Sequence, residues 1–151
     1  MEALQNLLAR NSAPKLQAPA PGGEALEHIF QAALRAPDHA RLRPWRFLVI
    51  EGEGRVRLGE LFAEVSRKAD PTISPEQMDK LRGNPLRAPM LIVAAARLQQ
   101  HPKVPEIEQY LSAGSAAQAM LLAAEAQGFA GIWRTGPMAF NDDVHAGLGL
   151  A

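Results

Sequence analysis

The fold class of this sequence is decided by the stretch Ala88-Pro89-Met90-Leu91-Ile92-Val93-Ala94-Ala95-Ala96. Its centre is an unbroken apolar run, and a run that short is best interpreted as a strand buried on both faces. A long helix is predicted next, over about residues 105–127. Its middle, Ser112 to Met120, is rich in small residues, which let backbones approach closely. We therefore expect this helix to be central and tightly packed, with Gly128 as its C-terminal cap.

Two further strand candidates lie on either side of this stretch, at residues 46–50 and 129–134. Gly52-Glu53-Gly54 is interpreted as a turn after the first of them. Apolar spacing predicts helices near residues 1–10, 26–34, 56–65 and 75–84, and Asn141 is a suitable cap for a last short helix. This mixture indicates a layered domain of helices and strands. Three strands make a small sheet with exposed edges, so we expect either strands from a partner chain or a missing C-terminal piece.

The composition is that of one globular domain of 151 residues, with 47% hydrophobic and 21% charged residues. Sixteen basic residues balance sixteen acidic ones, so no global charge points to nucleic acid or an anionic membrane. The absence of cysteine excludes disulfides, iron–sulfur ligation and thiol catalysis. With no leader pattern and no apolar run near the roughly 20 residues of a membrane span, the expected location is the cytoplasm.

The sequence offers no evident set of catalytic side chains. The four histidines, at 28, 39, 101 and 145, have no spacing typical of metal ligands, so no metal site is expected. There is no Gly-x-Ser-x-Gly motif and no Walker loop. Enzymes of this kind often leave the chemistry to a bound cofactor.

Three segments contain cationic residues, glycines and aromatic residues. Each segment alone is weak evidence of function, but their order along the chain is more specific. Arg10-Asn11-Ser12 is suited to clamp a phosphate, although alone it is more often a solvated turn. Arg35-Ala36-Pro37-Asp38-His39 joins a helix end to a polar loop and continues to Pro44-Trp45-Arg46-Phe47. The third segment is Gln127-Gly128-Phe129-Ala130-Gly131-Ile132-Trp133-Arg134, whose ordinary alternative is a connection that ends in a core tryptophan.

In their order and spacing, these segments resemble the FMN-dependent nitroreductase family, and most of all its short, single-domain bacterial branch, from residue 1 to about residue 149. The resemblance implies an α+β fold, a mixed sheet flanked by helices, in a homodimer with FMN at the subunit interface. Family members continue through another strand and a tail, so residues 1–151 are expected to form a flavin-binding domain that is C-terminally incomplete. FMN is then expected to be held less firmly.

The family also implies which residues bind the flavin. Arg10, Asn11 and Ser12 correspond to the element that holds the ribityl phosphate, with Asn11 in place of a second arginine. Arg35 and His39 resemble the residues that reach the flavin from the partner subunit. The backbone of Gly131, Ile132 and Trp133 corresponds to the segment that borders the reactive edge of the ring. Arg87 is a weaker candidate for the pyrimidine side.

The resemblance implies that NADH or NADPH passes a hydride to the flavin and leaves, after which a nitroaromatic or quinone-like acceptor is reduced. In that reaction the protein contributes positioning and electrostatics. Two alternatives remain at this point. One is a flavin-binding carrier or sensor without a reductive role, and the other is a helical interaction module that binds no flavin.

Overall fold

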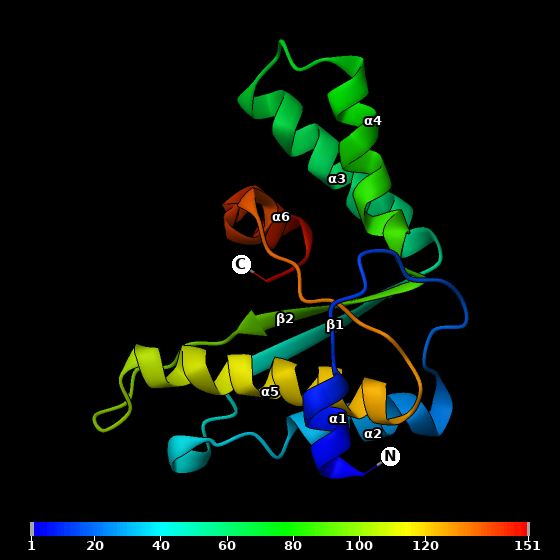
Figure 1. The fold of residues 1–151 in the computed structure, drawn as a ribbon. Coiled ribbons are helices and arrows are strands. Elements are labelled where there is room, and N and C mark those ends of the chain that lie inside the picture. Colours follow the sequence, from blue (N-terminus) through cyan, green and yellow to red (C-terminus); the bar gives the residue numbers. More distant parts are fainter. Residues whose placement is uncertain (1, 151) are drawn as a thin grey trace. The chain divides into compact units, whose positions relative to one another are not determined.

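The structure is a computed structural model that describes residues 2–150. Figure 1 shows its helices and strands in chain order. The elements are α1 (Ala3–Ala9), α2 (Gly23–Ala33), η1 (His39–Arg41), β1 (Trp45–Glu51), α3 (Glu53–Ala69), α4 (Pro75–Gly83), η2 (Asn84–Arg87), β2 (Met90–Ala96), α5 (Glu106–Ala126), η3 (Pro137–Phe140) and α6 (Asp142–Gly147), where η denotes a 3₁₀ helix.

The sheet consists of β1 and β2 alone among the described residues. The two strands run antiparallel, because the amide of Arg97, just after β2, donates to the carbonyl of Pro44, just before β1 (3.1 Å). The strands predicted at residues 46–50 and 88–96 are confirmed, although the second begins only at Met90. The third strand, predicted at 129–134, is wrong. The amide of Ala13 donates to Gly131 O, and Ala13 belongs to no strand, so no ladder forms there.

The second strand is also less buried than predicted. Met90 to Val93 are half-buried, and Ala94 and Ala96 are exposed. An unbroken apolar run predicts a strand covered on both faces, but a two-stranded sheet leaves each strand with one unpaired edge. The strand is therefore less buried in the described chain than its apolar sequence predicts.

Contacts between residues divide the chain into two compact units. The first comprises residues up to 14, 19–48 and 92–132, and the second comprises 15–18, 49–91 and 133 onward. The core of the first unit lies where α2 packs on α5. Its buried members are Ile29, Ala33, Trp45, Ala113, Ala116 and Met120.

The central position predicted for the small-residue helix is confirmed. Ala116 is fully buried and Ala113 is 9% exposed, and their short side chains let α2 approach the backbone of α5. Asn6, on α1, donates from Nδ2 to the carbonyl of Leu122 (2.9 Å), so α1 also lies on this helix. Figure 1 shows α1 and α2 beside α5.

The end of α5 follows from one glycine. Gly128 has a φ of +86°, a conformation that favours glycine. Its amide donates to Glu125 O, and the amide of Phe129 donates to Ala124 O. These two bonds form a Schellman motif, with Gly128 just after the cap residue. The motif ends the helix at Ala126 and redirects the chain into the segment that contains Gly131.

The second unit holds the helical hairpin of α3 and α4. Ser74 and Gln77 form a capping box at the start of α4, with Pro75 in the first turn. Gly59, on α3, lies so close to α4 that a Cβ atom there would come within 2.3 Å of the carbonyl oxygen of Arg82. Of Gly52-Glu53-Gly54, predicted as a turn, only Gly52 precedes α3, because Glu53 and Gly54 form its first turn.

Candidate functional site

The phosphate-clamp candidates lie where α1 ends. The amide of Arg10 donates to Asn6 O (3.1 Å), and Arg10 then leaves helical angles. Its guanidinium donates through Nη1 to Asn11 O (2.6 Å), which holds it over the turn while other N–H groups remain available. Arg10 is half-buried, whereas Asn11 and Ser12 are exposed.

This turn lies directly beside the glycine segment that follows α5. The amide of Ala13 donates to Gly131 O (3.2 Å), although the two residues are far apart in the sequence. Gly131 in turn packs on α5, since a Cβ atom there would come within 2.8 Å of Leu121 Cδ2. The structure thus brings two of the three predicted flavin segments together at the C-terminal half of α5.

The backbone of this segment offers free donors. Within the described chain, no residue accepts a hydrogen bond from the amides of Gly131 and Ile132, and both residues are half-buried. Unpaired amides at a partly buried position favour a polar ligand. Trp133 is 51% exposed, so this segment does not end in a core tryptophan; the core tryptophan is Trp45.

Arg35 and His39 belong to the same unit and follow α2 in the chain. Arg35 is exposed and directly follows α2, where its amide donates to Ala32 O (3.0 Å). The Nδ1 atom of His39 lies 2.6 Å from a carboxylate oxygen of Glu108, in the first turns of α5. Glu108 and Leu121 are thirteen residues apart, which is about 20 Å along a helix axis. His39 is therefore remote from Gly131 of its own chain.

Glu108 was not predicted from the sequence. It lies 69 residues from His39 in the sequence. Acidic residues are also common in the first turn of a helix, because they interact favourably with the helix dipole. No local pattern distinguishes Glu108 from Glu106, so only the packing of the loop at 37–43 on α5 identifies it. Arg87 is exposed, and its carbonyl accepts from the amide of Leu16 (3.0 Å).

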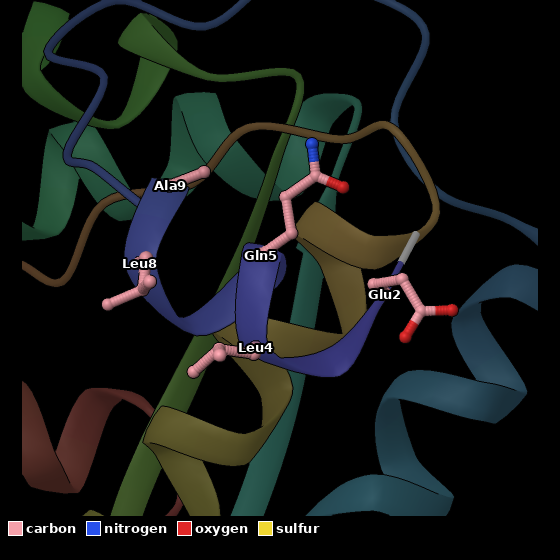
Figure 2. Close-up of a pocket in the computed structure, with 5 residues that line it drawn as sticks. All are labelled: Glu2, Leu4, Gln5, Leu8 and Ala9. Atoms are coloured by element: carbon pink, nitrogen blue, oxygen red, sulfur yellow. The ribbon is translucent and has the colours of Figure 1, made fainter.

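Within residues 2–150, the remaining features do not indicate a second site. Figure 2 shows a shallow hollow on α1, lined by Glu2, Leu4, Gln5, Leu8 and Ala9, in which Leu4 and Leu8 project from the same side of the helix. It contains none of the predicted residues. Residues 2–150 contain no group of three or more potential metal ligands, and none of their helices has the length and apolar character needed to cross a bilayer.

Comparison with known proteins identifies the family of the chain. Residues 7–151 match the nitroreductase family, and the chain belongs to it. The family resemblance drawn from the three segments is thereby confirmed. Membership supports an oxidoreductase.

Individual relatives cover nearly the whole chain. The Escherichia coli K12 protein named "Putative NAD(P)H nitroreductase YdjA" is 44% identical over 149 residues, which are 99% of this chain and 80% of that protein. The nitroreductase-like family protein from Bacillus cereus superposes with a TM-score of 0.81 at 22% identity, over 100% of this chain and 79% of the other.

A third similar protein is the FMN and NADPH-dependent nitroreductase NfnB from Sphigopyxis sp. strain HMH. Its TM-score is 0.75 at 20% identity, over 100% of this chain and 82% of the other. At this level of identity the two superpositions establish the fold alone. They confirm the predicted α+β class with a nitroreductase-like arrangement.

Proposed function

We propose that residues 1–151 form one flavin-binding domain of an FMN-dependent oxidoreductase. In this proposal NADH or NADPH reduces the flavin, and a nitroaromatic or quinone-like acceptor then reoxidises it. The observation that carries the proposal is the hydrogen bond between Ala13 and Gly131. It places a cationic turn beside a segment with free amides, and these two features suit a phosphate and the polar edge of a flavin ring.

The residues present fit an FMN molecule in their chemistry. The guanidinium of Arg10 and the hydroxyl of Ser12 are the donors that a phosphate needs. The amides of Gly131 and Ile132 supply preorganised donors without a charged side chain. When bound, the flavin supplies the hydride-transfer chemistry, and the chain binds and orients it. Two relatives support FMN and a nicotinamide as the cofactors. The name of one includes NAD(P)H, and the name of the other includes FMN and NADPH.

We further propose that the site is completed by a second copy of the chain. His39 is held at the N-terminal end of α5, about 20 Å along the helix from the level of Gly131. A flavin that lies beside Gly131 is therefore more accessible to His39 of a partner chain than to His39 of the same chain. In a homodimer with two-fold symmetry, each partner would contribute the same residues to the other's site.

Two exposed apolar stripes support this assembly. On α5, Ile107, Tyr110 and Leu111 are 51–64% exposed and follow the spacing of one helix face. On α1, Leu4, Leu7 and Leu8 form a second stripe of 58–79% exposure. Contiguous apolar surface of this kind is typical of an interface between proteins. We expect an interface above about 2,000 Å² in total.

The first experiment measures cofactor and assembly together. The purified protein is titrated with FMN while flavin absorbance is followed, and NADH and NADPH oxidation is then assayed with a nitroaromatic and a quinone acceptor. Light scattering gives the mass at micromolar concentration. Binding of FMN, turnover and a dimeric mass are the expected results. FMN binding without nicotinamide oxidation would instead support the carrier or sensor alternative, and a monomeric mass would contradict the shared site.

A complementation experiment tests the shared site directly. The Arg10→Ala and His39→Ala variants are each expected to bind FMN weakly. If each site takes Arg10 from one chain and His39 from the other, a mixed dimer of the two variants has one intact site and one doubly impaired site. Random exchange should then restore about a quarter of the sites. No recovery after verified subunit exchange would show that both residues serve a site within one chain.

A further inference from the structure

The loop from Pro37 to Arg43 has an unfavourable backbone that is fixed by its own side chains. Ala40, Arg41 and Arg43 have φ values of 62°, 53° and 49°, which are costly for residues with a Cβ atom. Asp38 stabilises this path. One of its oxygens accepts from the amide of Leu42 (3.0 Å), and the other accepts from the amide (3.0 Å) and the guanidinium (2.8 Å) of Arg43.

Two more hydrogen bonds fasten the loop from outside. The hydroxyl of Ser112, on α5, donates to Pro37 O (2.5 Å), and Gln99 donates from Nε2 to Leu42 O (2.7 Å). Gln99 is itself held by the fully buried side chain of Gln109, which bonds both the amide and the carbonyl of Gln99 at 2.8 Å. The path of the loop backbone is therefore determined without any contribution from the His39 side chain.

The contact between His39 and Glu108 is consequently not needed to hold the loop. Their side chains are 54% and 45% exposed, and an exposed pair of this kind contributes little to stability. What the contact does determine is the state of the imidazole ring. A carboxylate oxygen 2.6 Å from Nδ1 requires a proton on Nδ1, and it directs Nε2 away from α5. Among the described residues, none bonds Nε2.

The residues around His39 and Glu108 indicate which surface the His39 Nε2 atom faces. Glu108 precedes Leu111 by three residues and therefore lies beside it on α5. Leu111 belongs to the exposed apolar stripe that we assign to the partner. The His39 imidazole is thus fixed at the border of the proposed interface. It does not lie at the Gly131–Trp133 segment of its own chain, which we expect to border the flavin.

We propose that Glu108 is a positioning residue. It keeps the proton of His39 on Nδ1, so that Nε2 is the nitrogen offered to the flavin of the partner's site. This inference rests on the proposed function, in which His39 reaches that flavin. Glu108 itself touches no cofactor, and it acts only through the orientation and tautomer of His39.

The tautomer is tested on the full chain without flavin. Imidazole nitrogens are observed by ¹H–¹⁵N NMR at mildly alkaline pH, and the His39 signals are identified by their loss in His39→Gln. We expect the Nδ1–H form in the unmodified protein and in Glu108→Gln, whose amide oxygen still accepts. Glu108→Ala should shift the ring toward the Nε2–H form, whereas Ser112→Ala, which loosens only the loop, should not. An Nε2–H ring in the unmodified protein, or no change in Glu108→Ala, overturns the proposal.

FMN titration of the same variants tests the consequence. Glu108→Ala should raise the Kd about 3- to 10-fold, the scale of one hydrogen bond, and Glu108→Gln should raise it less. In a His39→Ala background, Glu108→Ala should have no further effect. If the unmodified protein binds FMN and Glu108→Ala binds it equally well, this inference alone is overturned. If the unmodified protein binds no FMN, the proposed function fails, and the inference fails with it.

Discussion

The amide of Ala13 donates a hydrogen bond to the carbonyl oxygen of Gly131 across 3.2 Å. This one contact joins the turn after α1 to the segment after α5, and it does so in the half of α5 that is remote from His39. The candidate site therefore has a part contained within one chain, formed by Arg10 to Ser12 with Gly131 and Ile132. Its other part, which includes His39, requires assembly in the function that we propose.

Replacement of Arg10 by alanine should weaken FMN binding by about 1.5–3 kcal/mol, the scale of a hydrogen bond to a charged group. Isothermal titration or flavin fluorescence gives the Kd. Arg67→Ala is a matched control, because it removes an exposed arginine from the last turn of α3. Unchanged affinity in Arg10→Ala would show that the clamp is assigned to the wrong residue.

Ala40→Gly should stabilise the protein by roughly 0.5–1 kcal/mol. Alanine at φ 62° and ψ 13° is in the left-handed region, where glycine avoids the steric cost of Cβ. Chemical denaturation measures the free energy of unfolding. As a control, Ala32→Gly, inside α2, should destabilise by about 1 kcal/mol, because glycine is unfavourable within a helix. A loss of stability in Ala40→Gly would contradict the strained loop.

Gly59→Ala should destabilise the α3–α4 hairpin by about 1–3 kcal/mol, the usual range for overpacking. The added Cβ would come within 2.3 Å of the backbone oxygen of Arg82, so α4 would have to move away from α3. Gly83→Ala gives the opposite test in the same hairpin. Its backbone is helical, and nothing lies within 4 Å of the added atom, so it should stabilise by about 0.5–1 kcal/mol. Equal effects of the two changes would disprove the close helix contact.

Thr72→Ala should raise the pKa of Asp70. In the loop before α4, the Thr72 hydroxyl donates to Asp70 Oδ1 (2.6 Å), and so does the Thr72 amide (2.9 Å). The hydroxyl bond is the largest cause that holds the pKa of this carboxyl below its usual value, and the amide bond is the next. Carboxyl NMR titration measures the change. An unaltered Asp70 pKa in Thr72→Ala would mean that the amide alone stabilises the charged form.

The lowered pKa of Asp70 also determines how protein stability should depend on pH. A carboxyl whose pKa is lowered by folding stabilises the protein at pH values above its unfolded pKa. This contribution is lost as the pH falls through the folded pKa. The difference in stability between the unmodified protein and Thr72→Ala should therefore include a part that is present near neutral pH and disappears in acid. A difference that is independent of pH would point to lost packing instead.

Much of the fold was determined by local sequence signals. Small residues from Ser112 to Met120 predicted a central helix, and Ala116 is fully buried in it. Gly128 predicted the end of α5, and Asn141 predicted the start of α6, where its side chain accepts from the amide of Val144 (3.1 Å). These signals could be interpreted because a cap or a helix face depends on residues only a few positions apart.

The sequence by itself thus determined the helices, two of the three predicted strands and the family. Only the tertiary structure decided how the candidate flavin-binding residues are grouped. Residues 129–134 are apolar enough for a strand, but a strand needs a partner ladder, and Gly131 instead bonds Ala13 and packs on Leu121. The contact of His39 with Glu108, across 69 residues, likewise follows from packing of a loop on α5. Sequence patterns encode local backbone preference, whereas contacts between distant residues depend on how the whole chain is packed.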